Sequence, residues 1–190
     1  MSKIILASSS IYRQELLKRL PIKFSSTSPN INEARIHDES FEDQARRLSN
    51  EKAEAIAKKN PSAFVIGSDQ TAEFNNKEVR KPLSIEKAFI QLNELSGQTI
   101  NFYSGVCLKN MQKNISTDAV VKFSVTYKKL SEDQIKNYLK MEDPTQCVGS
   151  IKSEGLGITL LERIRCNDPT AVIGLPLIKL SQMFEKYGVI

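Results

Sequence analysis

Asp69 is the residue at which the sequence first suggests chemistry. It follows residues 63–66, an apolar run whose length and β-branched content are typical of a buried strand. In α/β proteins, ligand chemistry is usually placed at the carboxyl end of a strand. We therefore expect Asp69 to be catalytic; the alternative is that it only caps a turn, because Gly-Ser-Asp is also common turn chemistry.

The serines at residues 8–10 suggest a second part of a site. They lie between a strand predicted over residues 3–7 and a helix predicted over residues 13–20. Backbone N–H groups, hydroxyls and the positive end of a helix would meet there, which outlines a phosphate site. Arg13 opposes the helix dipole in the first turn and so needs another reason to be there, such as an anionic ligand. The alternative is an ordinary serine N-cap, with Arg13 on the surface.

Three lysines stand at positions where a cation would be unusual or well held. Lys52 occupies a core-facing position of a helix predicted over residues 40–59, and it either extends outward along the core or points into a site. Lys81 precedes a proline, which restricts its backbone to extended conformations. Lys152 lies in the glycine-containing residues 147–158, which form either the edge of a ligand site or a tight crossover.

Together these residues suit a triphosphate. The sequence places cations and acids in loops or inward positions, and the acids are Asp69, Glu154 and Glu33, of which Glu33 has a surface position as its alternative. A triphosphate carries about four negative charges, which cations and a divalent metal neutralise while carboxylates hold the metal and orient the attacking water.

An α/β fold would have to position these candidates. Apolar runs and alternating patterns predict strands over residues 3–7, 63–66, 98–109, 119–128 and 159–164, with a short hairpin at 71–79. Helical spacing and capping residues predict helices over residues 13–20, 40–59, 84–95, 131–142 and 176–187.

Composition narrows the class of protein. A chain of 190 residues with 40% hydrophobic content can bury one core, so we expect a single domain over residues 1–190. The net charge of +5 fits an anionic ligand such as a nucleotide and only weakly suggests nucleic acid. An aromatic content of 7% without interleaved basic segments disfavours an RNA-binding module.

The few histidines and cysteines argue against several kinds of catalytic and metal site. His37 is the only histidine, and the three cysteines lack CxxC spacing, so Ser-His-Asp and Cys-His catalysis and zinc sites are disfavoured. No apolar run has the length of a signal peptide or a membrane span, so we expect a cytoplasmic protein with no membrane partner.

The sequence resembles the Maf family of nucleotide pyrophosphatases over almost its whole length. The matching segments keep the family's order and are LASSSIYRQELL (residues 6–17), IGSDQ (66–70), KP (81–82), GSIKSEGLG (149–157) and GLPL (174–177). The glutamine after Asp69 and the Lys-x-Glu-Gly-Leu-Gly stretch look like the 7-methyl-GTP pyrophosphatase subgroup and unlike the dTTP/UTP subgroup. Two departures are Ile11, where the family usually has proline, and Arg80, where glycine usually precedes Lys81.

This resemblance implies a fold and an activity. The fold would be an elongated mixed sheet with flanking helices and two lobes around a central cleft, similar to the Maf and ITPase proteins and often dimeric. The activity would be hydrolysis of a nucleoside triphosphate, 7-methyl-GTP in this subgroup, between its α- and β-phosphates with a divalent cation (Mg, Mn or Co). The role would be a house-cleaning one that keeps modified nucleotides out of nucleic acids; the alternative is a nucleotide-binding regulator of septum formation or cell division.

The resemblance also implies roles for single residues. Asp69 is similar to the family's proton acceptor, and Glu33 to a metal-supporting carboxylate; the alternative for Asp69 is that it is itself a metal ligand. The phosphate-binding groups would be Ser8, Arg13, Lys52 and Lys81, to which we add Lys152 from its own position in the chain. The positions linked to base selection would be Tyr12, Gln70 and Glu154. Because a 7-methylated guanine is cationic, an acidic Glu154 and the face of Tyr12 would favour it over neutral bases.

Overall fold

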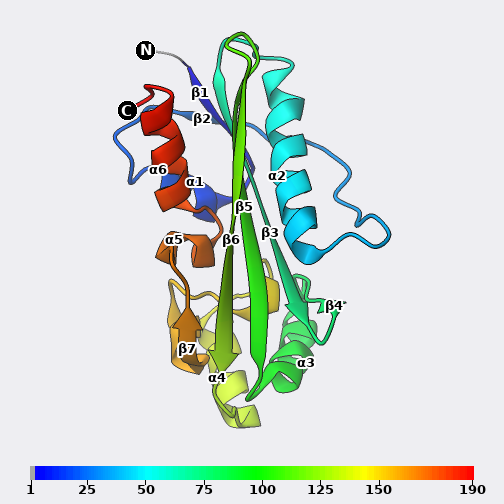
Figure 1. Ribbon diagram of the computed structural model, residues 1–190. Helices are drawn as coiled ribbons and strands as arrows, with labels where there is room; N and C mark the ends of the chain where they lie inside the picture. Colours follow the sequence, from blue (N-terminus) through cyan, green and yellow to red (C-terminus); the bar gives the residue numbers. More distant parts are fainter. Residues whose placement is uncertain (1–2) are drawn as a thin grey trace. The chain divides into compact units, whose positions relative to one another are not determined.

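The computed structural model describes residues 3–190 and has helices packed on a seven-stranded sheet (Figure 1). The strand order is β2-β1-β3-β5-β6-β7, with β4 paired to β3. The strands are β1 (Ile4–Ala7), β2 (Ser25–Ser26), β3 (Phe64–Phe74), β4 (Lys77–Glu78), β5 (Thr99–Asn110), β6 (Ile115–Tyr127) and β7 (Leu161–Arg165). The helices are α1 (Ile11–Leu17), α2 (Phe41–Ala57), α3 (Ile85–Leu95), α4 (Glu132–Met141), α5 (Pro169–Ile173) and α6 (Leu177–Lys186), with short 3₁₀ helices at η1 (Val148–Ser150) and η2 (Leu156–Leu160).

The chain divides into two compact units. Unit 1 contains the chain up to Gln70 together with Tyr103–Val121 and Asp168–Ile190, and unit 2 contains Thr71–Phe102 and Lys122–Asn167. The α/β class and the mixed sheet with flanking helices are confirmed. The central cleft between two lobes stays a prediction.

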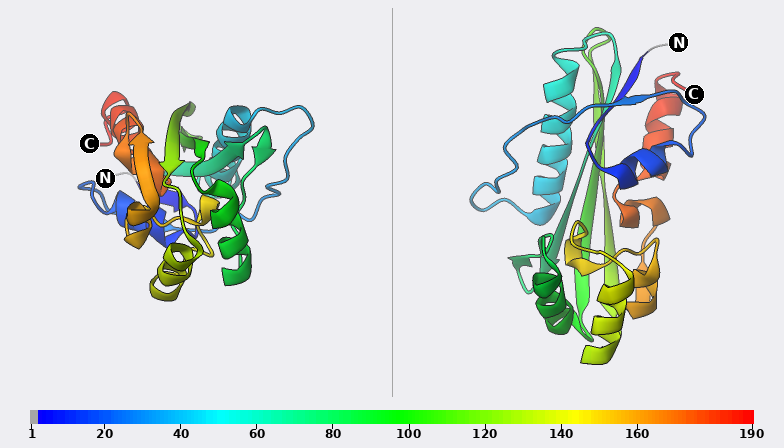
Figure 2. Two further views of the ribbon diagram at one scale, coloured as in Figure 1. Left: turned by 90° about the horizontal axis from the view of Figure 1, so that it is seen from below. Right: turned by 180° about the vertical axis from the view of Figure 1, so that it is seen from behind.

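Two hydrophobic cores form around β1 in unit 1. Ile4 and Leu6 belong to the core that also contains residues of α1 and α6, whereas Ile5 and Ala7 belong to the core that contains residues of α2. Successive side chains of a strand point to opposite faces, so a strand covered on both faces is apolar throughout. This explains why all four residues of β1 are apolar. Figures 1 and 2 show α2 on one side of β1 and α1 and α6 on the other.

The pairing of β1 with β3 brings the two candidate segments together. The strands are parallel, with Ile4 opposite Phe64 and Ala7 opposite Gly67, so that residues 8–10 follow β1 beside the segment that carries Asp69. The prediction that the Asp69 strand ends at residue 66 was wrong, because β3 continues through Asp69 to Phe74. Asp69 is therefore part of the strand and does not cap a turn, and it is β1 that ends at the site.

Side-chain caps fix the starts of several helices as predicted. Ser40 accepts a hydrogen bond from the Asp43 backbone N–H at the start of α2, and Ser131 forms a capping box with Gln134 at the start of α4. The structure also contains a helix that the sequence pattern did not predict, α5. Asp168 caps α5 and Pro169 occupies its first turn. Among residues 3–190, no helix combines the length and apolar composition that a membrane crossing requires.

Candidate active site

A buried ion pair lies at the centre of the candidate site in unit 1. Lys52, from the middle of α2, places its Nζ 2.5 Å from Oδ1 of Asp69 on β3. The two residues are only 5% and 7% exposed. Of the two alternatives for Lys52, the structure therefore shows the one in which the ammonium points toward the predicted catalytic residue.

Glu33 joins the same ammonium from a loop. Its Oε1 lies 2.8 Å from Nζ of Lys52, and its side chain is 58% exposed. One cation thus contacts two carboxylates, one buried and one open to solvent. The structure brings together the two residues predicted to support a metal.

Arg13 and Ser8 form the second part of the candidate site. The Arg13 guanidinium donates from Nε to the carbonyl oxygen of Gly174 at 2.8 Å, and its Nη1 lies 3.5 Å from Oγ of Ser8. Ser10 is the N-cap of α1, so the ordinary serine cap is present as well. The alternative that placed Arg13 on the surface is wrong, since its guanidinium is held by the carbonyl of Gly174, the C-cap of α5.

Burial and neighbouring charges shift the pKa values of Asp69 and Arg13 in opposite directions. Burial raises the pKa of the Asp69 carboxyl, while Lys52 and Arg13 oppose that change. Burial lowers the pKa of the Arg13 guanidinium, and Asp69 and Glu33 oppose that change. Arg13, Lys52, Glu33 and Asp69 are therefore close enough to interact electrostatically as one group.

Gln70 is tied to α5 by its side chain. Its Nε2 donates to Oγ of Ser104 at 2.9 Å and to the carbonyl oxygen of Ala171 at 3.0 Å, and Ser104 donates to the same carbonyl at 2.8 Å. Tyr12, the other base-selection candidate in unit 1, is half-buried in the first turn of α1. That either residue touches a base stays a prediction.

The remaining candidates lie in unit 2. Nζ of Lys152 forms an ion pair with Oε1 of Glu142 at 2.8 Å, and Oε2 of Glu142 accepts from the Leu156 backbone N–H at 2.9 Å. Glu142 at the end of α4 thereby fixes the turn that carries Lys152 and the exposed Glu154. Lys81 is exposed. That these three residues face the Asp69 cluster stays a prediction.

Sequence reasoning missed Gly174 and Glu142, which hold site residues in place. Gly174 acts through its backbone carbonyl, which every residue type has, so its role could not be read from the sequence. Its left-handed φ of 119° is typical of a glycine at the end of a helix. The signal for α5 was present, since an aspartate followed by proline is a typical helix start. Glu142 had no distinguishing pattern.

The donor set fits a metal that arrives with a phosphate ligand. Among the described residues, no group of three or more His, Cys, Asp or Glu side chains is arranged to hold a metal by itself. However, Glu33 and Asp69 place carboxylate oxygens on one cation, the Lys52 ammonium. Mg²⁺ is commonly held by one or two carboxylates together with substrate phosphates. That Glu33 and Asp69 hold such a metal stays a prediction.

The sequence comparisons match almost the full chain. A family model described as "Maf-like protein" matches residues 3–187. A protein of Nitrosococcus oceani named 7-methyl-GTP pyrophosphatase is 44% identical over 185 residues, covering 97% of this chain and 93% of that protein. A protein of Hydrogenovibrio crunogenus with the same name is 46% identical over 188 residues, covering 98% and 93%. The solved Ham1 protein of Staphylococcus aureus matches at 19% identity with a TM-score of 0.44, covering 67% of this chain and 71% of that structure.

Proposed function

The chain belongs to the Maf family, and from that premise we propose that it is a nucleoside triphosphate pyrophosphatase that cleaves 7-methyl-GTP to 7-methyl-GMP and pyrophosphate. The observation that carries this proposal is the buried Asp69 carboxylate, held by Lys52 and lying within electrostatic reach of Arg13 and Glu33. A regulator of septum formation is not favoured, because relatives named as pyrophosphatases match over nearly the whole chain.

In the proposed reaction, Asp69 accepts the proton of a water molecule that attacks the α-phosphorus. The contact of Oδ1 with Lys52 fixes the orientation of the carboxylate, and its place on a strand of the sheet keeps it rigid. Proton acceptance requires the ionised carboxylate. Burial raises the pKa of Asp69 and so opposes that form, while Lys52 and Arg13 favour it.

The cations have a separate role, which is to hold the triphosphate. Arg13 presents a planar guanidinium suited to phosphate oxygens, and Ser8 adds a hydroxyl donor beside it. We propose that Lys52, Lys81 and Lys152 neutralise the remaining phosphate charge and the charge that develops on the departing pyrophosphate. A divalent metal (Mg, Mn or Co) held by Glu33 and Asp69 would supply further charge neutralisation when bound.

The test of this function is a nucleotide panel assayed for pyrophosphate release with magnesium, manganese or cobalt. We expect release of pyrophosphate, with the highest kcat/KM for 7-methyl-GTP. Binding of nucleotides without release of pyrophosphate would contradict the proposal and favour a regulator.

The pH dependence of activity tests the role of the ion pair. Activity requires ionised Asp69, so kcat/KM should fall on the acid side as the carboxyl becomes protonated. Lys52 opposes the rise in the pKa of Asp69, and Lys52→Met should therefore raise that pKa further and move the acid limb to higher pH. The measurement is the pH profile of kcat/KM, with Lys58→Met, a change at the C-cap of the same helix, as control. An acid limb that stays in place in Lys52→Met would contradict this assignment.

The base preference can be tested at Glu154. If its carboxylate attracts the positive charge of 7-methylguanine, Glu154→Gln should lower the ratio of kcat/KM for 7-methyl-GTP to that for GTP by roughly fivefold to tenfold, while GTP turnover changes little. Steady-state kinetics with both nucleotides give the ratio. A ratio equal to that of the wild type would remove the charge argument.

We further propose a cellular setting for this activity. As one domain over residues 1–190, the protein would act in the cytoplasm as a homodimer and would remove modified nucleotides before they enter nucleic acids. The nucleotide substrate is its expected partner. We expect neither a membrane nor nucleic acid as a partner, and the modest net charge of +5 disfavours the latter.

A further inference from the structure

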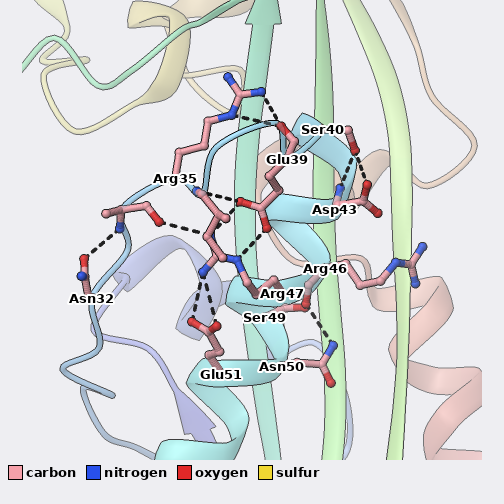
Figure 3. A network of polar contacts seen from close by, with 12 residues as sticks. Asn32, Arg35, Glu39, Ser40, Asp43, Arg46, Arg47, Ser49, Asn50 and Glu51 are labelled. Atoms are coloured by element: carbon pink, nitrogen blue, oxygen red, sulfur yellow. Dashed lines mark hydrogen bonds and ion pairs between the residues drawn. The ribbon is translucent and has the colours of Figure 1, made fainter.

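Arg47 on α2 contacts both ends of the loop segment that follows Glu33. Figure 3 shows Glu39 near the end of this loop pointing at Arg47 on α2. Nε and Nη2 of Arg47 donate to the two carboxylate oxygens of Glu39, at 2.6 and 2.8 Å. The side chains are only 19% and 9% exposed. A bidentate, largely buried arginine–carboxylate pair is stronger than an ordinary surface ion pair.

Arg47 also reaches the residue next to Glu33. Its Nη2 donates to the carbonyl oxygen of Ala34 at 3.2 Å, and its Nη1 lies 3.2 Å from Oε2 of Glu51, one turn further along α2. One guanidinium therefore joins both ends of residues 34–39 to the helix. Hydrogen bonding to Arg47 lowers the pKa of Glu39, which favours the ionised carboxylate that this pair requires.

The same loop is braced by a second arginine. Nε of Arg35 donates to the carbonyl oxygen of Glu39 at 3.1 Å, and its guanidinium lies 4.0 Å from the centre of the Phe41 ring. The first contact closes the loop on itself, and the second joins Arg35 to Phe41, the first residue of α2. The contacts of Arg47 attach the loop to the helix.

Glu33 needs such an attachment because no helix or strand holds it. Asp69 is fixed within β3 and Lys52 within α2, whereas Glu33 lies in a segment without regular structure and is 58% exposed. Ordering a residue in a single backbone conformation costs about 1–2 kcal/mol, so a loop carboxylate keeps one position only if other contacts hold the chain.

We propose that Arg47 is a positioning residue that fixes residues 34–39 along α2 and thereby sets the Glu33 carboxylate on Lys52 beside Asp69. The consequence for catalysis rests on the proposed function, whereas the attachment of the loop does not. Lysine cannot replace arginine here, since a single ammonium lacks the fork that binds both oxygens of Glu39 and the Ala34 carbonyl together.

The first test measures the loop directly. Trypsin cleaves after Arg35, which is exposed, and the appearance of fragments 1–35 and 36–190 by mass spectrometry gives the rate of cleavage at this bond. Arg47→Lys should raise this rate roughly tenfold, because it releases the loop without unfolding the protein. Arg46→Lys is the matched control, a neighbouring change on α2 whose ion pairs go to Glu42 and Asp118, and it should leave the rate unchanged.

The second test asks whether Arg47 acts through Glu33. Arg47→Lys should lower kcat/KM roughly tenfold in the wild-type background but less than twofold in a Glu33→Gln background, because residues that act as a unit are not additive. A general loss of structure would lower activity equally in both backgrounds. If Arg47→Lys fails to fold, Glu39→Gln replaces it, since this change weakens the same pair and leaves the arginine in place.

The outcomes separate this inference from the proposed function. Faster cleavage after Arg35 together with a non-additive loss of activity supports the inference. An unchanged cleavage rate, or equal losses in both backgrounds, would overturn it while an active wild-type enzyme still supported the proposed function. A wild-type protein that releases no pyrophosphate from any nucleotide would contradict the proposed function, and the cleavage rate alone would then decide whether Arg47 holds the loop.

Discussion

Asp69→Asn should lower kcat by roughly a thousandfold or more, within the range expected for loss of a positioned general base. Asparagine keeps the size of the side chain and can stay close to Lys52, but it cannot accept a proton from water. The measurement is pyrophosphate release from 7-methyl-GTP at saturating nucleotide. Activity close to that of the wild type would remove Asp69 from the mechanism.

The folded structure should survive this change. Asp69→Asn removes one partner of a buried ammonium, which is usually destabilising, but Glu33 also contacts Lys52 and remains as its counter-charge. The burial that raises the pKa of Asp69 also means that a neutral side chain is tolerated there. Circular dichroism and thermal unfolding check this point, and Asp118→Asn is a suitable control because it changes a carboxylate that pairs with Arg46.

Gly67→Ala should lower the free energy of unfolding by roughly 3 kcal/mol, at the upper end of the cost of overpacking. A Cβ atom at Gly67 would lie 2.0 Å from the Ser49 carbonyl oxygen and 2.7 Å from the Ala53 backbone nitrogen. Both atoms belong to the backbone of α2, so the helix itself would have to move. Because α2 carries Lys52, this movement should also weaken the contact with Asp69 and reduce activity.

Urea denaturation measures this effect, and Gly188→Ala provides the comparison. Gly188 has a φ of +63° but nothing within 4 Å of an added Cβ, so its replacement should cost only the strain of the left-handed conformation, about 1 kcal/mol. A loss for Gly67→Ala no larger than that for Gly188→Ala would show that α2 does not need the close approach to β3.

Local patterns predicted most of the helices and strands, but they misplaced the end of β3. The apolar run stops at Ile66, yet β3 continues through polar residues to Phe74. These residues are held by groups distant in sequence. Ser68 Oγ, for example, lies 2.8 Å from the carbonyl oxygen of Gly105 and 3.0 Å from that of Gly174. A hydroxyl that is satisfied by backbone carbonyls after folding looks like a turn residue in the sequence.

The candidate site was predictable to the extent that side-chain type carries information. An inward lysine in a helix and an acid after a buried strand indicated the pair formed by Lys52 and Asp69. The contact of Arg13 with the Gly174 carbonyl, and that of Arg47 with Glu39, depend on which distant segments meet. A surface-like Arg–Glu pair in a sequence gives no indication that its two members are largely buried.

The most direct test of the account is hydrolysis of 7-methyl-GTP in oxygen-18-labelled water. If water activated by Asp69 attacks the α-phosphorus, mass spectrometry should find the label in 7-methyl-GMP and find unlabelled pyrophosphate. Label in pyrophosphate, or release of orthophosphate instead of pyrophosphate, would contradict it.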